Sequence, residues 1–281
     1  MQEKWIKAEQ LAAFAGYLRQ EERSAGTVTN YLRHVRSFAA WLGNTPVTKE
    51  GAAQWKKHLI AQGYSPNSVN AMLAAINCFF NHMEWGECRV KPLRIQRKLF
   101  RDDSRDLKKS EYDRLVAAAV SLGRERLALL LEAICATGIR VSEVQYLTVE
   151  AALQGRAVIS LKGKIRTILL PNRLCRKLLK YAQKKGITSG EIFITRGGKG
   201  LSRRQIWAEM KTLCRKAGVE PSKVFPHNLR HLFAQTFYKV CRDIAKLADI
   251  LGHSSVETTR LYLISTGSEH VKALEHLGII L

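Results

Sequence analysis

A basic segment separates two parts of the chain with different hydrophobic patterns, and it constrains the fold more than any other feature. It runs from Arg89 to Arg101 and carries six basic residues, no acidic residue and one proline. The helical spacing of apolar residues that precedes it lapses within it. A chain of 281 residues is long enough for two domains that each bury a core. We therefore predict two domains joined by a basic linker.

The part before the linker is predicted to be a bundle of short helices. Apolar residues recur at steps of three and four on both sides of a break at Ser24 to Thr27, which indicates two helices. A third helix is expected from Ala52 to Gln62, and Ser65-Pro66 predicts the start of a fourth. This gives an all-helical domain over residues 1–88 and a linker over residues 89–106.

The part after the linker, residues 107–281, is predicted to be mostly α with a small β-hairpin. A helix is expected near Ser110, which we take as its N-cap. RAVISL and IRTILLP alternate around Lys162-Gly163-Lys164, a pattern typical of two strands and a turn. Further helices are expected over residues 124–135, 142–147, 173–185, 202–217, 228–240 and 243–251, with a candidate short strand from Glu191 to Thr195.

The net charge predicts a polyanionic partner. Lys and Arg number 46 against 24 Asp and Glu, which gives +22. Nucleic acid fits better than membrane, because no helix pattern combines a strong apolar face with a lysine-rich opposite face. No apolar run is long enough to span a bilayer, and the N-terminus has no signal-peptide pattern, so we expect a cytoplasmic protein.

The sequence gives no sign of a bound metal or nucleotide. The six cysteines are scattered without a CxxC pair, which favours reduced, buried thiols over disulfides or zinc. Neither a Walker loop nor a carboxylate cluster is present. We therefore expect no metal and no cofactor.

Four short motifs carry residues suited to breaking a phosphodiester bond without a metal: TGIRVSEV (137–144), LKGKIR (161–166), HNLRH (227–231) and LGHSSVETTRLYL (251–263). That reaction needs cations on the non-bridging oxygens, a nucleophile, and groups that move protons. Arg140 and Arg230 offer guanidinium forks that match phosphate. Tyr262 can be the nucleophile if nearby cations and a histidine help it ionise, since its ordinary pKa is about 10. Each residue alone is more often structural, and the joint pattern carries the prediction.

In this order and spacing the motifs resemble the tyrosine recombinase family, the phage-integrase-like site-specific DNA recombinases. His227 and Arg230 match the HxxR motif of the family, His253 follows Arg230 by 23 residues, and Tyr262 follows His253 by nine. The N-terminal bundle resembles the core-binding domain of the family. The resemblance therefore covers nearly the full chain.

The resemblance implies a role for each matching residue. Arg140 and Arg230 would clamp the scissile phosphate while Tyr262 attacks it, giving a 3′-phosphotyrosyl bond and a free 5′-hydroxyl. His227 would act in proton transfer around the nucleophile, and His253 would hydrogen-bond a non-bridging oxygen.

Two further residues are implied. Lys162 on the hairpin matches best the lysine that protonates the leaving 5′-oxygen, and Lys164 is the competitor because the hairpin departs from the common GKGxKxR pattern. Glu143 would orient Arg140 as a carboxylate behind it.

Local patterns add three expectations. Ser254 and Glu257 have capping-box spacing, which predicts a helix that carries Tyr262 about two turns from its start. The Trp-x-Asp segment often seen after the SE motif is missing, which leaves QYLTVEAALQGR without a predicted structure. Arg203 and Arg204 begin a helix and are candidate DNA contacts, although a solvated helix start explains them equally well.

The resemblance also implies an assembly. Four protomers would act on double-stranded DNA with short inverted-repeat half-sites, and an arm-binding domain is expected to be absent. The segment STGSEHVKALEHLGIIL, which follows the nucleophile, has apolar residues at helical spacing and could pack on its own domain or dock on a neighbouring protomer.

Two other functions stay open at this point. A DNA-binding regulator on the same fold would not need Tyr262, and a type IB topoisomerase-like enzyme would relax DNA without strand exchange. Integration of a mobile genetic element, inversion and dimer resolution all fit the recombinase hypothesis. We expect a prokaryotic, nucleoid-associated protein.

Overall fold

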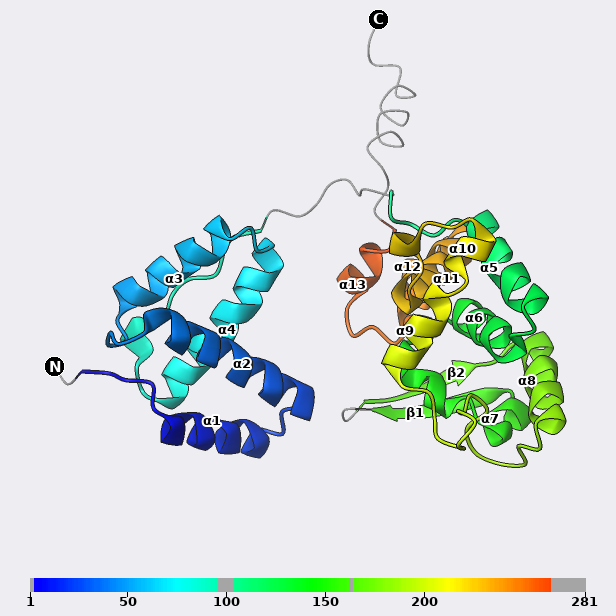
Figure 1. Ribbon diagram of the computed structural model, residues 1–281, viewed down its shortest axis with the longest axis horizontal. Coiled ribbons are helices and arrows are strands. Elements are labelled where there is room, and N and C mark those ends of the chain that lie inside the picture. The colour runs from blue at the N-terminus through cyan, green and yellow to red at the C-terminus, as the bar shows by residue number, and fades with distance from the viewer. Residues whose placement is uncertain (1–2, 96–103, 162–163, 264–281) are drawn as a thin grey trace, which may run out of the picture. The chain divides into compact units, whose positions relative to one another are not determined.

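The computed structural model describes residues 3–95, 104–161 and 164–263. Contacts within the chain divide it into two compact units, residues 1–97 and 98–281. Each unit has a hydrophobic core of its own, and Figure 1 labels the helices and strands of each. The finer bounds of the linker stay a prediction, because residues 96–103 lie outside the described part.

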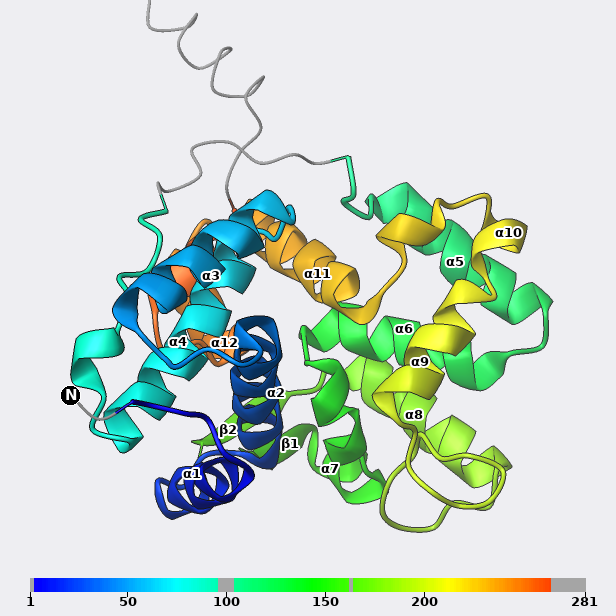
Figure 2. The ribbon, with the colours of Figure 1, turned by 60° about the vertical axis from the view of Figure 1, so that its left-hand side comes forward.

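The first unit is helical throughout its regular structure. Ser24 and Ser65 cap their helices as predicted, since their hydroxyls accept hydrogen bonds from the backbone N–H of Thr27 and Ser68. The last long helix contacts the other three, an arrangement visible in Figure 2. The elements are α1 (Ala8–Gln20), α2 (Ala25–Leu42), α3 (Lys49–Ala61), α4 (Pro66–His82) and the short 3₁₀ helix η1 (Gly86–Cys88).

Aromatic side chains fill the core of this unit. The ring of Phe38 lies 5.0 Å from that of Trp55 and 5.9 Å from that of Phe80. All three residues are fully or almost fully buried. Burying a side chain of this size stabilises the fold by roughly 1.5–3 kcal/mol relative to exposure. The helical periodicity of the sequence therefore translates directly into one packed face on each helix.

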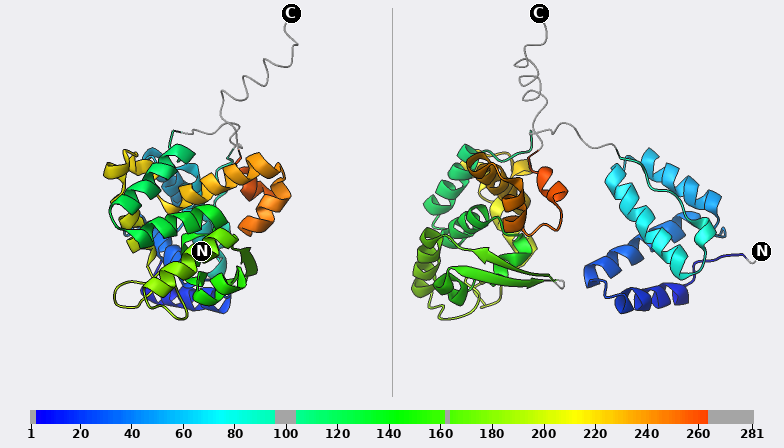
Figure 3. Two further views of the ribbon diagram at one scale, coloured as in Figure 1. Left: turned by 90° about the vertical axis from the view of Figure 1, so that its right-hand side faces the viewer. Right: turned by 180° about the vertical axis from the view of Figure 1, so that it is seen from behind.

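The second unit is mostly α with one antiparallel hairpin, as predicted. Helix α6 lies at its centre and contacts α5, α8 and α11 (Figures 1 and 3). The elements are α5 (Lys109–Ser121), α6 (Glu125–Thr137), η2 (Val141–Tyr146), α7 (Val149–Gln154), β1 (Arg156–Leu161), β2 (Lys164–Leu169), α8 (Asn172–Lys184), α9 (Arg203–Lys211), α10 (Cys214–Ala217), η3 (Pro221–Lys223), α11 (Pro226–Cys241), α12 (Ile244–Leu251) and α13 (Val256–Arg260).

The hairpin has the predicted strands, and its register shows where β2 begins. Leu161 pairs with Lys164 and Ile159 pairs with Arg166, so Lys164 opens β2. The segment after η2, for which no structure was predicted, forms α7. Thr148 caps this helix, which packs against β1. In the right panel of Figure 3 the two strands extend away from the helices of this unit.

Three local predictions were wrong. Helix α5 begins at Lys109 rather than after Ser110, because the Glu111 carboxylate accepts a hydrogen bond of 2.8 Å from the Lys108 N–H. The predicted helix over 202–217 breaks into α9 and α10, where the Thr212 hydroxyl donates to the Glu209 carbonyl and tightens the last turn. The candidate strand near residue 191 forms isolated bridges instead.

Gly138 ends α6 in a place where a side chain does not fit. Its φ is +64°, and an added Cβ would lie 2.4 Å from Cδ1 of Phe233. Gly155 ends α7 with a similar φ of +69°, but nothing lies within 4 Å of its Cβ position. The two glycines share the left-handed conformation and differ in the space around them.

We expect Gly138→Ala to destabilise the protein more than Gly155→Ala. Both changes place alanine in the left-handed region, at a cost of about 1–2 kcal/mol. Crowding against Phe233 adds about 1–3 kcal/mol for Gly138→Ala alone. Urea unfolding of both variants measures the difference. Equal losses would show that Phe233 moves aside without cost.

Candidate active site

Arg140 and Glu143 form the first part of the site. Gly138 turns the chain out of α6, so that Arg140 immediately precedes η2. The Glu143 carboxylate accepts one hydrogen bond from the Arg140 backbone N–H (2.7 Å) and one from the Arg140 guanidinium (3.0 Å). Burial raises the pKa of Glu143, but bonds from Arg140 and the charge of Arg166 outweigh it, so the pKa is lower than usual. Glu143 is therefore an ionised carboxylate that orients Arg140.

Arg166, which was not predicted as a site residue, joins the same carboxylate from β2. Its guanidinium forms an ion pair with Glu143 and donates a 3.0 Å hydrogen bond to the Ile250 carbonyl. It stands in the LKGKIR motif, two residues after Lys164. The KxR that ends the GKGxKxR pattern matches Lys164-Ile165-Arg166, and this match was the signal that could have found it.

Arg230 is the buried member of the arginine pair. It lies on α11, is 2% exposed, and donates to the carbonyls of Gly138 and Leu251, the latter at 2.8 Å. Burial, followed by the charge of Arg140, lowers the pKa of Arg230 to about 10. Arg230 therefore stays positively charged at neutral pH.

His253 follows the left-handed Gly252 that ends α12. Its Nε2 lies 2.9 Å from the Arg230 guanidinium, and its Nδ1 lies 2.8 Å from the Thr259 hydroxyl. A guanidinium only donates, so Nε2 must accept and the proton lies on Nδ1. Burial, and then the charges of Arg230 and Arg140, lower the pKa of His253 to about 4. The imidazole is neutral at neutral pH.

Tyr262 is surrounded by three histidines. Its ring centroid lies 5.5 Å from that of His227, 5.3 Å from that of His231 and 5.6 Å from that of His253. The residue is buried, and it lies close enough to Arg230 to act on the pKa of that guanidinium. His231 was not predicted as a site residue; its Nδ1 lies 3.9 Å from a carboxylate oxygen of Asp106.

The predicted helix around Tyr262 needs correction. Ser255, rather than Ser254, caps α13, because its hydroxyl accepts a hydrogen bond from the Glu257 N–H. The helix ends at Arg260, so Tyr262 lies in the turn that follows, where its N–H bonds to the Thr259 carbonyl. The capping-box spacing indicated the helix start to within one residue but not its length.

The structure thus brings six of the predicted residues together. It does not decide between Lys162 and Lys164. The six are Arg140, Glu143, His227, Arg230, His253 and Tyr262. Lys162 lies outside the described residues, and Lys164 begins β2. A pocket of about 410 Å³ opens beside Arg140, Arg166 and His253, and Arg203 at the start of α9 also lines it.

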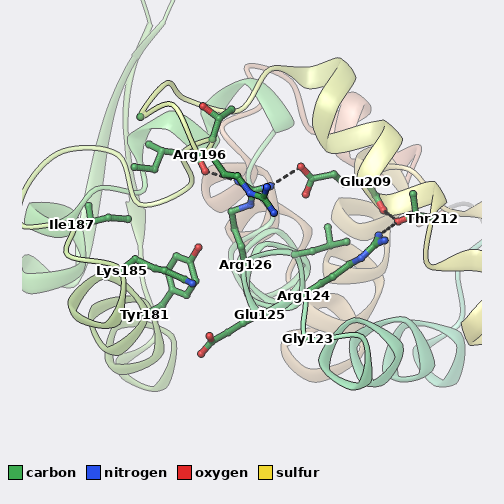
Figure 4. Close-up of a pocket in the computed structure, with 14 residues that line it drawn as sticks. Gly123, Arg124, Glu125, Arg126, Tyr181, Lys185, Ile187, Arg196, Glu209 and Thr212 are labelled. Atoms are coloured by element: carbon green, nitrogen blue, oxygen red, sulfur yellow. Dashed lines mark hydrogen bonds and ion pairs between the residues drawn. The ribbon is translucent and has the colours of Figure 1, made fainter.

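A larger cavity of about 700 Å³ lies elsewhere in this unit (Figure 4). None of the predicted site residues lines it. Arg126, at its centre, already donates to the Ile194 carbonyl and to Glu209, and Arg124 bonds to Thr212. These two arginines are engaged with the protein itself, which makes the cavity a poor candidate for the phosphate site.

Within residues 3–95, 104–161 and 164–263, no three His, Cys, Asp or Glu residues are placed to hold a metal ion. In the same ranges no helix has the length and apolar character to cross a membrane. The six cysteines form no disulfide.

Comparison with known proteins agrees with this geometry. Residues 105–269 match the model of the phage integrase family, and residues 11–86 match that of the phage integrase N-terminal SAM-like domain. Tyrosine recombinase XerA of Pyrococcus furiosus is 30% identical over 100% of this chain and 98% of its own length. Tyrosine recombinase XerD of Vibrio cholerae is 25% identical over 89% of each chain.

Solved structures share the fold. The Tn1549 transposon integrase in complex with transposon right end DNA matches 96% of this chain and 99% of its own, with a TM-score of 0.74 and 15% identity. A lambda integrase dimer bound to a core site matches 91% of this chain and 94% of its own, with a TM-score of 0.72 and 17% identity. Because the family model spans both arginines, the three histidines and Tyr262, and a curated tyrosine recombinase aligns end to end, the chain belongs to the phage integrase family and is a tyrosine-type site-specific recombinase.

Proposed function

We propose that this recombinase cleaves and rejoins DNA through a 3′-phosphotyrosine bond on Tyr262, without metal or ATP. The observation that carries the proposal is the position of Tyr262, whose ring is enclosed by three histidines and lies next to the buried Arg230. Arginine and histidine groups placed in this way stabilise a pentavalent phosphate and move the proton of the attacking hydroxyl. The DNA in complex with the Tn1549 integrase supports DNA as the substrate.

The chemical steps follow from these positions. The Tyr262 oxygen attacks the phosphorus while its proton passes to His227, and the bond to the 5′-oxygen breaks. Arg140 and Arg230 neutralise the non-bridging oxygens, to which His253 also donates. A lysine of the hairpin gives its proton to the leaving 5′-oxygen. Attack by a second 5′-hydroxyl on the phosphotyrosine reverses these steps and completes the exchange.

The lysine is one of two candidates. Lys162 matches the resemblance best, and Lys164 is the alternative. Lys164 opens β2 two positions before Arg166, whose side chain contacts Glu143. The family pattern favours position 162.

We also propose a tetramer on inverted-repeat half-sites, held in part by the segment 264–281 of a neighbouring protomer. A groove of about 690 Å³ between α5, α6, α8 and α11 is mostly apolar. Val240 in this groove is 79% exposed, with Phe233 and Phe237 beside it. An exposed apolar groove fits an amphipathic segment, and the apolar residues of 264–281 stand at helical spacing.

We also propose a DNA contact by Arg203 and a location for the protein. Arg203 lines the site pocket, which supports a DNA contact from the start of α9. We place the protein in the prokaryotic cytoplasm with the nucleoid.

Tyr262→Phe is expected to abolish the covalent adduct while DNA binding is retained, since only the attacking oxygen is lost. The substrate is DNA nicked near the cleavage point, built from repeats flanking the gene and shown by competition to be bound specifically, and the readout is a denaturing gel. Tyr181→Phe, a buried tyrosine outside the site, serves as the matched control and should form adduct normally.

No adduct with the wild-type protein on such DNA would reject the catalytic mechanism and favour a DNA-binding regulator. An adduct without exchange between two labelled sites would favour a topoisomerase-like activity.

Substituting the proton-donating lysine by alanine is expected to slow cleavage by about 10²–10⁴-fold. A substrate whose leaving 5′-oxygen is replaced by sulfur should restore the rate, because a thiolate leaves without a proton. Lys162→Ala and Lys164→Ala are compared in single-turnover assays on both substrates. Sulfur rescue of one variant identifies the donor, and rescue of neither would exclude both lysines from the role.

A further inference from the structure

We propose that Arg166 is a positioning residue, which fixes Arg140 and His253 for the scissile phosphate; this role rests on the proposed function. The side chain of Arg166 contacts three residues of the site. It extends from β2 to the carboxylate of Glu143, to the carbonyl of Ile250 near the end of α12, and to the backbone of Gly252. One side chain thus joins the hairpin, η2 and the segment that carries His253.

The exposures of the two arginines on Glu143 divide their roles. The side chain of Arg140 is 41% exposed, whereas that of Arg166 is 15% exposed. Arg140 thus keeps surface that a phosphate can reach, whereas the two terminal nitrogens of Arg166 bond to Glu143 and to the Ile250 carbonyl, which ties it to the residues around it. Arg166 therefore acts on the reaction through other residues.

Arg166 influences the position of Arg140 through Glu143. The carboxylate is 2% exposed, and a buried charge is tolerated only when it is paired and hydrogen-bonded. Arg166 supplies one partner, while Arg140 supplies the backbone N–H and the guanidinium. Without Arg166, the carboxylate would keep only its hydrogen bonds from Arg140, and the two side chains could rotate together.

Arg166 influences the position of His253 through the backbone of Gly252. A Cβ at residue 252 would lie 2.4 Å from Cδ of Arg166, so the arginine stem lies directly against the backbone before His253. Among the residues that the structure describes, the Arg166 Nε is buried without a hydrogen-bond partner. Leaving a donor unpaired has a cost, so the other contacts of Arg166 must hold it in this orientation.

The test measures the single-turnover rate of adduct formation on the nicked DNA. We expect Arg166→Ala to slow cleavage by about 10–100-fold, as is usual when a group behind a functional residue is lost. DNA affinity should match that of Arg156→Ala, the control. Arg156 opens β1 at the other end of the same hairpin, opposite Leu169, and loses the same charge. Arg166→Lys should recover part of the rate.

A double-mutant cycle with Glu143→Gln separates positioning from a general loss of structure. If Arg166 acts through the carboxylate, its removal should cost far less in the Glu143→Gln background than in the wild type. Hydrogen exchange of the peptide containing Ile250 to His253 is the second readout, and it should be faster in Arg166→Ala than in Arg156→Ala.

Cleavage by Arg166→Ala at the rate of Arg156→Ala would overturn the proposal, as would fully additive losses in the cycle. If the wild type itself forms no adduct, the proposed function fails and hydrogen exchange decides the positioning role. Unchanged exchange would then reject that role, and faster exchange would support it.

Discussion

The site depends on the buried charge of Arg230. Removing a guanidinium from water is expensive unless its donors are satisfied. Here the carbonyls that accept from it belong to Gly138 and Leu251, which lie at the C-terminal ends of α6 and α12. Helix C-termini carry partial negative charge and unpaired carbonyls, so two helices converge on one cation. The left-handed glycines that end these helices let the chain turn away at the point of contact.

The charge balance around Arg230 prepares the site for an anion. Among the described residues that line the adjacent pocket, Glu143 is the one carboxylate, and the same pocket is lined by Arg140, Arg166 and Arg203. Burial, and then the charges of the surrounding arginines, lower the pKa of His253. A phosphate placed there would be attracted by the same arginine charges that help to keep His253 neutral.

The sequence was enough to predict what is local or ordered along the chain. Helix periodicity and caps such as Ser24 and Ser65 located most helices, and the ordered motifs located Arg140, Arg230 and Tyr262 before any geometry was known. What was missed depends on tertiary contact. Arg166 acts from a strand, and His231 matters because it stacks on Tyr262 while it faces Asp106, 125 positions earlier in the chain.

In the free protein, the hydrogen bonds of His253 leave it without an N–H for a phosphate oxygen. Its Nε2 accepts from Arg230, and its Nδ1–H donates to Thr259, so the ring has no proton to offer a non-bridging oxygen. To donate from Nε2, the imidazole must gain a proton or change tautomer. The negative charge of a phosphate offsets the arginines that depress its pKa, and therefore favours the protonated ring. Without a phosphate, the neutral imidazole of His253 reduces charge repulsion among the cations of the site. A bound phosphate would favour the protonated imidazole, which then has an N–H to donate to it.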